Sequence, residues 1–329
     1  MRVFWDWLRL TRSDPPGAAK TDPAAAATYR AALEQFEELI DASASAGYAA
    51  RPLPLFYALS QAGRAIVAAR GGEDHQVHGL TLDRNIPTNL LEAVVAPQKT
   101  GVAGQFGTVA SSVVSPVIQQ PVTLGALIHS RPEMGVELES STDWPKALPL
   151  FIVPWGPVPS PGNTRIALVM EEESVAAKDL GAALSKYPYS NRIRVNQIVA
   201  SSFPTLPTRP TPKGSGVELV WLGDEASLDK DLPQYRYRGW RWLRPSLAAG
   251  QVPPSPLMTW WVLLFGLSMV ARYHPVPWTQ ALDVDASPAA VTLELTMNRA
   301  IDALPHLVFE AVMDVRIALP PRDSYDPFG

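Results

Sequence analysis

LMTWWVLLFGLSMVARYHPVPW, from Leu257 to Trp278, is the stretch of sequence that decides the fold. Its first fifteen residues carry no charge, and Arg272 and His274 follow directly. The prolines after His274 prevent the helix from continuing. Since about 20 apolar residues are needed to cross a bilayer, we expect a buried core helix with polar groups at its end, and no membrane span.

The composition is that of a globular protein with a large core. The chain has 329 residues, of which 47% are hydrophobic and 18% charged, and it contains ten tryptophans. A net charge of -4 argues against a surface that is basic overall, so any site for a polyanion must be local. With no cysteine, disulfides, thiolate metal sites and a cysteine nucleophile are excluded. The N-terminus lacks the features of a signal peptide, which predicts a cytoplasmic protein.

Two helices are expected before residue 75. Asp22-Pro23 is a capped helix start, and the alanine-rich helix that it opens should run to about Ala42. A second helix should begin at Pro52 or Pro54 and end at Gly71-Gly72. Their apolar stripes predict that the two helices pair.

The middle of the chain has the character of strands, and the last part returns to helix. Four runs are rich in β-branched and aromatic residues, and a fifth strand is expected at Tyr235–Leu243. The strand runs are Leu148–Trp155, Thr164–Glu171, Arg192–Ala200 and Val217–Leu222. After the core helix, Ser287-Pro288 should open another helix that Pro305 interrupts.

These elements predict an α+β fold. We expect N- and C-terminal helices that form a shared bundle, with a mostly antiparallel sheet of four to five strands between them in sequence. The regions are 1–145, mainly helical; 146–245, β-rich; and 246–329, helical and packed on the N-terminal helices. We expect them to form one integrated unit.

Several segments, taken in order, resemble the YaaC-like family of bacterial proteins. They are FWDWLRLTRS at Phe4–Ser13, LPLFYALSQAGRAIVAAR followed by His78-Gly79, GVAGQFGTVASSV at Gly101–Val113 with VTLGAL after it, and WWVLLFGLSMVARYHPVPW. No single segment is a catalytic signature, and the specificity lies in their order. The resemblance implies one unit of family length in the cytoplasm, and it implies no reaction or cofactor.

Arginine and histidine side chains are the candidate catalytic groups. Arg272 could bind an anion while His274 acts as acid, base or hydrogen-bond donor. A cation at a helix C-terminus is also explained by the helix dipole alone. If the second helix packs against the core helix, Arg64 and His78 could join Arg272 and His274 in one pocket.

The loop after the second helix allows two further interpretations. Glu73, His75 and His78 could ligate zinc or manganese, although a solvated loop explains the same residues. Arg70 and His75 have the spacing used by helical nucleases of the HEPN type, but chance supplies about one such match in this chain. We therefore assign no metal ligand.

The run YRYRGWRWLR, from Tyr235 to Arg244, is the strongest signal for nucleotide or nucleic-acid binding. In one strand, a single face would carry cations for phosphate and rings for stacking a base. The residues of that face are Arg236, Arg238, Trp240, Trp242 and Arg244. The alternative is a strand whose tryptophans pack on the helices while arginine stems cover their rims.

Three functions follow from these patterns. The first is a protein that binds a nucleotide or RNA, with RNA cleavage through His274 or His78. The second is a non-catalytic interaction or scaffold protein that uses proline-rich segments at Pro204–Pro212, at Pro253–Pro256 and after Pro320. The third is a metal-dependent small-molecule enzyme that uses the Glu73, His75 and His78 group.

Overall fold

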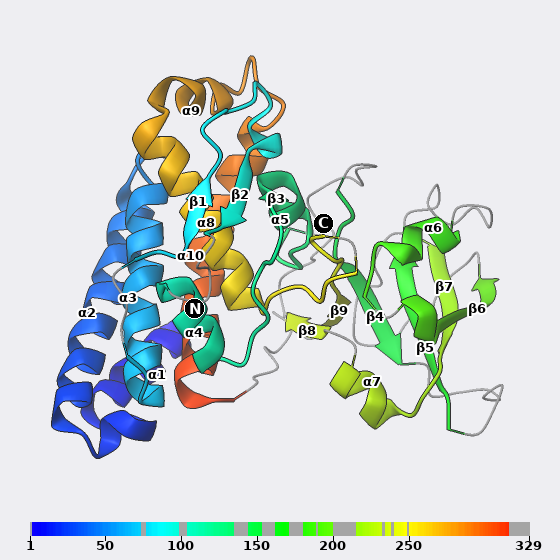
Figure 1. The fold of residues 1–329 in the computed structure, drawn as a ribbon, viewed down its shortest axis with the longest axis horizontal. Helices are drawn as coiled ribbons and strands as arrows, with labels where there is room; N and C mark the ends of the chain where they lie inside the picture. The colour runs from blue at the N-terminus through cyan, green and yellow to red at the C-terminus, as the bar shows by residue number, and fades with distance from the viewer. Residues whose placement is uncertain are drawn as a thin grey trace. The chain divides into compact units, whose positions relative to one another are not determined.

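The chain folds into two units in the computed structural model (Figure 1). The structure describes residues 2–73, 77–98, 104–134, 144–152, 162–170, 180–188, 190–199, 215–231, 234–237, 240–248 and 250–315. Unit 1 comprises Met1–Ile128 and Pro254–Arg316, and unit 2 comprises His129–Pro253 with Ile317–Gly329. The larger part of unit 2, His129–Pro253, is therefore inserted along the chain between two parts of unit 1.

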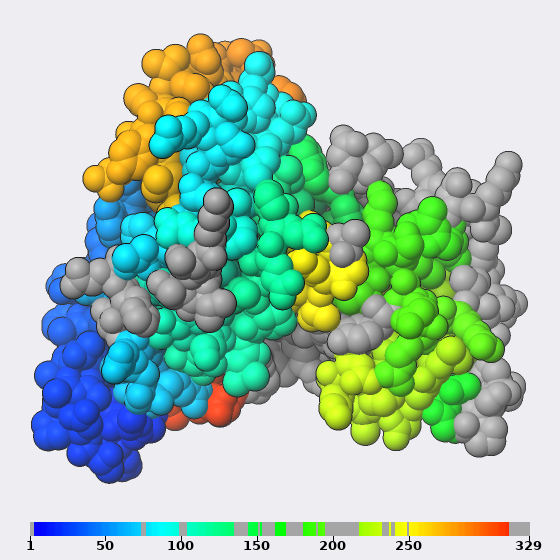
Figure 2. Space-filling view, in the orientation of Figure 1, coloured from blue at the N-terminus to red at the C-terminus, as the bar shows by residue number. Residues whose placement is uncertain are grey.

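Unit 1 combines helices with a small antiparallel sheet. Its helices are α1 (Arg2–Ser13), η1 (Gly17–Lys20), α2 (Pro23–Ser45), α3 (Pro52–Arg70), η2 (Leu90–Glu92), α4 (Gln105–Ser112), α5 (Leu124–His129), α8 (Pro256–Tyr273), α9 (Pro275–Ala281) and α10 (Ala290–Met313). The sheet has the order β1 (Leu80–Leu82), β2 (Val94–Pro97), β3 (Val122–Thr123) and was not predicted from the sequence. Residues 77–98 and 104–128, cyan to teal, form much of the face of unit 1 seen in Figure 2.

The paired helices α2 and α3 follow the sequence prediction closely. The Asp22 carboxylate accepts a hydrogen bond from the Ala24 N–H and so caps α2. At the C-terminus of α3, Gly71 has a φ of 73° and ends the helix in the left-handed conformation that glycine adopts most easily. The two helices pack along their length, as their apolar stripes predicted.

The core helix α8 is buried from Leu257 to Ser268. It packs on α3, on α10, and on β1 and β2. Glycine allows two of these contacts: a Cβ on Gly63 of α3 would lie 2.5 Å from the Trp261 ring, and one on Gly266 would lie 2.7 Å from Leu124 and Val95. Because α3 and α8 touch at Gly63, N- and C-terminal helices share one core.

The last helix differs from its prediction. It begins at Ala290 rather than at Pro288, and it continues through Pro305 to Met313 without interruption. Proline removes one N–H from the helix ladder, but Pro305 and its neighbour His306 are buried. Packing of α10 against α1, α3 and α8 outweighs that lost hydrogen bond.

Unit 2 is built on a six-stranded sheet in which every neighbouring pair is antiparallel. The order is β6 (Ile193–Val199), β7 (Ser215–Trp221), β5 (Thr164–Met170), β4 (Leu148–Ile152), β9 (Trp240–Leu243), β8 (Gln234–Tyr237). The helices are α6 (Leu180–Ser185), η4 (Ser190–Arg192) and α7 (Glu225–Asp231). Leu184 of α6 and Leu228 of α7 join the sheet residues Leu150, Leu168 and Leu219 in one core, so both helices cover the same face.

The sheet corrects the predicted count of four to five strands. The predicted fifth strand, Tyr235–Leu243, is two strands, β8 and β9, which form a hairpin. The α+β class itself is confirmed.

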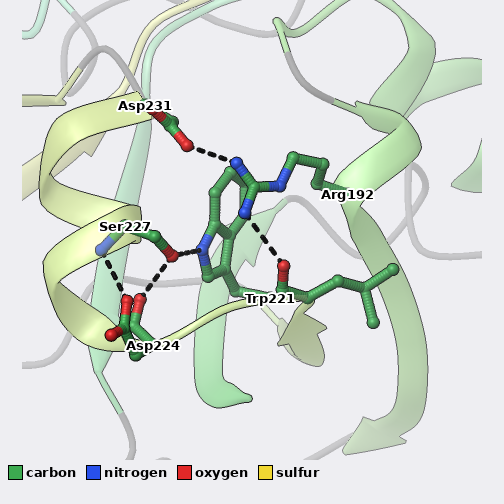
Figure 3. A network of polar contacts seen from close by, with 6 residues as sticks. Arg192, Trp221, Asp224, Ser227 and Asp231 are labelled. Carbon is green, nitrogen blue, oxygen red and sulfur yellow. Dashed lines mark hydrogen bonds and ion pairs between the residues drawn. The ribbon is translucent and has the colours of Figure 1, made fainter. Parts of the chain in front are cut away.

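A polar network holds α7 against the end of β7 (Figure 3). The Trp221 indole N–H donates to the Ser227 hydroxyl at 3.0 Å, and the Ser227 N–H donates to the Asp224 carboxylate at 2.8 Å. Arg192 lies over the Trp221 ring, pairs with Asp231, and donates to the Leu222 carbonyl. Every residue of this network has a partner within unit 2, so we interpret it as structural.

In the part of the chain that the structure describes, no helix is both long enough and apolar enough to span a membrane. The core helix α8, the one stretch that raised this question in the sequence, is a helix of 18 residues that ends in Arg272 and Tyr273.

Candidate functional site

The end of α8 brings polar and aromatic side chains to the surface of unit 1. Arg272 is exposed, and its guanidinium lies 3.4 Å from the Tyr57 hydroxyl of α3. It also lies 5.0 Å from the centre of the Tyr273 ring. Tyr57 and Tyr273 are 43% and 55% exposed, so Arg272 contacts two accessible aromatic side chains. We call Tyr57, His78, Arg272 and Tyr273 the α8-end cluster.

His78 belongs to this cluster through the packing of its ring. The imidazole lies against Phe56 of α3 and Phe265 of α8, with ring centres 5.3 and 5.8 Å apart. Burial lowers the pKa of His78, and the positive charge of Arg272 lowers it further. The imidazole is therefore held neutral near pH 7, the form that accepts a proton.

The backbone around His78 is fixed by the start of α4. The Gln105 N–H donates to the Val77 carbonyl at 2.7 Å, and the Phe106 N–H donates to the His78 carbonyl at 3.2 Å. Gly79 and Gly104 make this possible, because a Cβ on Gly104 would lie 2.6 Å from the Gly79 nitrogen. Two segments of the family resemblance, the one with His78-Gly79 and the one with Gly104, thus meet to position His78.

Two of the four predicted catalytic residues, His78 and Arg272, lie near each other in the structure. Arg272 is close enough to His78 to lower its pKa, as the packing of α3 on α8 suggested. Arg64 lies seven residues after Tyr57 on α3, about two helical turns along the axis. His274 ends α8, and in the described structure its hydrogen bonds are those of the backbone, to the Val270 carbonyl and from the Trp278 N–H. Sequence analysis missed Tyr57, although it shares a helix face with Arg64.

The hairpin rearranges the arginine-rich run. The register pairs Tyr235 with Trp242 and Arg236 with Arg241, so aromatic positions oppose aromatic ones and arginines oppose arginines. Arg241 forms ion pairs with Asp229 and Glu225 of α7. Trp242 and Arg244 are 3% exposed. Arg238 lies outside the described residues, as do the side chains of Arg236 and Trp240, so the predicted binding role of this run stays a prediction.

The proposed metal group is only partly described. Glu73 and His78 are described, whereas His75 lies outside the described residues. No group of three histidine, aspartate or glutamate side chains that could hold a metal ion occurs among the residues that are described. The metal-dependent enzyme therefore gains no support from the geometry.

His129 is a second histidine with a displaced pKa, but it lies in the interior. It is 6% exposed, its ring lies 5.5 Å from that of Trp144, and burial, together with the charge of Lys146, lowers its pKa to about 4. A group so enclosed in unit 2 has a role in stability rather than in binding a substrate.

We expect His129 to make unit 2 sensitive to acid. The unfolded chain binds a proton at this residue near pH 6.5, whereas the folded chain does so only near pH 4. Stability should therefore fall as the pH is lowered from 6.5 to 4, and His129→Phe should weaken that dependence. Thermal unfolding across this pH range, followed by tryptophan fluorescence, measures the difference; equal slopes for both proteins would contradict it.

The described structure thus defines an α+β protein with a cluster of polar and aromatic groups at the end of its central helix. The family described as YaaC-like Protein matches residues 8–312, and the chain belongs to the YaaC-like family. The resemblance seen in the sequence is confirmed. Comparison with curated proteins and with solved structures found no match.

Proposed function

We propose that this protein binds a nucleotide or RNA at the α8-end cluster and cleaves RNA there, with His78 as the proton-transfer group. The proposal rests mainly on exposed Arg272, which contacts the Tyr57 hydroxyl and the Tyr273 ring and whose charge helps to lower the pKa of His78. Arginine suits a phosphate, and accessible rings stack bases of any sequence.

Cleavage of RNA requires a group that accepts a proton and a cation that stabilises the phosphoryl oxygens. Neutral His78 takes the proton from a ribose 2′-hydroxyl, and the 2′-oxygen attacks the adjacent phosphorus. The bond to the 5′-oxygen breaks, and that oxygen takes a proton from water, which leaves a 2′,3′-cyclic phosphate. Arg272 stabilises the charge that develops on the phosphoryl oxygens. Arg64 and His274 remain further candidate catalytic residues.

The other two functions receive less support. Pro253 and Pro254 are buried, so they offer no exposed proline-rich segment, and residues 204–212 and those after 320 lie outside the described residues. The arginine-rich run could extend an RNA site in unit 2, but its described members Trp242 and Arg244 are buried. We therefore place the binding site in unit 1.

Arg272→Gln tests the binding step. Loss of one charge-assisted phosphate contact, worth about 1.5–3 kcal/mol, should weaken binding of a labelled single-stranded RNA about tenfold or more at low salt. Arg84→Gln is the matched control, because it removes the same charge from an exposed loop residue of unit 1. Fluorescence anisotropy measures both; equal losses in the two variants, or no binding by the wild type, would overturn the proposal.

His78→Asn tests the chemical step. Cleavage of the RNA should fall by about 100-fold or more, while binding is retained. In Arg272→Gln the pKa of His78 should rise towards its ordinary value, because one of the two causes of its lowering is removed; an NMR titration follows this. Cleavage unchanged in His78→Asn would remove His78 from the mechanism.

A further inference from the structure

A cavity of about 120 Å³ lies at the opposite end of α8, away from the α8-end cluster. It forms where α3 and α10 end and α8 begins, and its polar lining comes from Arg70, Ser255, Glu310 and Asp314. Leu257 and Leu307 provide apolar walls. Positively and negatively charged side chains therefore line one small cavity within unit 1.

One side of the cavity offers hydrogen-bond donors. The Arg70 guanidinium donates to the Ala311 carbonyl and pairs with Asp314, both through the same terminal nitrogen. Its Nε–H is buried and has no hydrogen-bond partner among the described residues. At the start of α8, the Ser255 hydroxyl, which lines the cavity, accepts a hydrogen bond from the Met258 N–H. An arginine with an unpartnered N–H, beside the N-terminus of a helix, suits a carboxylate.

The other side carries a buried carboxylate. Glu310 is 6% exposed, and one of its oxygens lies 3.2 Å from Nε2 of His306, which is 2% exposed. The ring of Phe4 in α1 covers this histidine, with ring centres 4.9 Å apart. An acidic side chain kept out of water at the wall of a cavity suits a positively charged group of a ligand, such as an ammonium.

Two residues at or next to the cavity have an unusual backbone conformation. Val114 and Asp314 are the two non-glycine residues with positive φ in the described part of the chain, at 51° and 58°. Asp314 lines the cavity, and Val114 follows the lining residue Val113. A β-branched residue with positive φ is strained, and such strain is found preferentially at functional sites.

The volume limits the ligand. A cavity of about 150 Å³ holds benzene, which has six heavy atoms. The cavity between Arg70 and Glu310 therefore accepts a molecule with about six heavy atoms. Its cationic and anionic lining groups are complementary to a ligand that carries both a carboxylate and an ammonium.

We propose that this cavity binds a small zwitterion of amino-acid size, such as glycine, alanine or serine. Its carboxylate accepts hydrogen bonds from Arg70 and from the first turn of α8, and its ammonium donates to Glu310. The site is separate from the α8-end cluster, and it stands on its own lining residues.

Calorimetric titration of the full chain tests this site. Glycine, alanine and serine are the probes, and ethylamine and propionate are matched molecules that each carry one of the two charges. We expect saturable binding of at least one amino acid, and binding of each singly charged molecule at least tenfold weaker. No saturable binding of any amino acid at millimolar concentration, or equal binding of a singly charged molecule, would overturn the proposal.

Two variants locate the binding. Glu310→Gln should weaken amino-acid binding at least tenfold, because it removes the charge that meets the ammonium. Ala311→Val fills part of the cavity from its wall without removing a polar group, and should abolish binding while the protein stays folded by circular dichroism. Glu38→Gln, on an exposed face of α2, is the control. Unchanged binding in Ala311→Val would place the ligand elsewhere and refute the site.

Discussion

Trp261→Ala is expected to lower the free energy of unfolding of unit 1 by about 3–5 kcal/mol, the usual cost of removing a fully buried tryptophan. Trp261 is 0% exposed and lies where α8 meets α3, with its ring on Gly63 and edge-on to Phe56. Urea unfolding followed by circular dichroism measures the loss. A loss below about 1 kcal/mol would mean that the contact between α3 and α8 does not hold unit 1 together.

A pair of smaller changes isolates the contact itself. Gly63→Ala should cost about 1–3 kcal/mol, because its Cβ would lie 2.5 and 2.7 Å from two atoms of the six-membered ring of Trp261. Trp261→Phe removes those atoms, and also an indole N–H that is buried without a partner among the described residues. Gly63→Ala should therefore cost less in the Trp261→Phe protein, and equal costs in both proteins would contradict the geometry.

Gly104→Ala is expected to destabilise unit 1 by about 3 kcal/mol and to displace His78. The new Cβ would lie 2.6 to 2.8 Å from backbone atoms of Gly79 and Val77, which cannot move aside as a side chain can. Overpacking costs about 1–3 kcal/mol, and each of the two hydrogen bonds from α4 to this segment adds about 1 kcal/mol when broken. Urea unfolding measures the stability, and RNA cleavage reports on His78.

The control for this prediction is Gly47→Ala. Nothing lies within 4 Å of a Cβ on Gly47, and its φ is not positive, so the change should be within about 0.5 kcal/mol. If Gly104→Ala is as well tolerated as Gly47→Ala, the close approach of Gly104 to Gly79 does not fix the position of His78.

The helices could be predicted because their signals are local. Asp22-Pro23 and Gly71 determine where the adjacent helices begin and end. The uncharged run of α8 is too apolar to lie on the surface of the protein, so it predicts a core helix. Pro305 failed as a local signal, because the tertiary packing of a 24-residue helix outweighed one missing hydrogen bond. The hairpin of β8 and β9 was missed because the alternation of arginines and aromatics also fits a single strand.

The candidate sites depend on contacts between distant segments, which limits prediction from sequence. The electrostatic effect of Arg272 on His78 agrees with the expectation that α3 packs on α8. The contact of Tyr57 with Arg272 could not be predicted, because it depends on which face α3 turns towards α8. Glu310 and His306 are one helical turn apart on α10, a spacing visible in the sequence. Their burial beside a cavity was not visible, because the cavity is made by four helices and the residues next to them.

The insertion of unit 2 into the chain of unit 1 has a consequence for biosynthesis. The ribosome releases α2 and α3 first, but α8 and α10, which cover them, emerge only after His129–Pro253 has been made. At about 5–20 residues per second, the apolar faces of α2 and α3 wait on the order of ten seconds for their partners. During that interval the nascent chain exposes the surface that Trp261 later covers, and chaperones have their best opportunity to bind it.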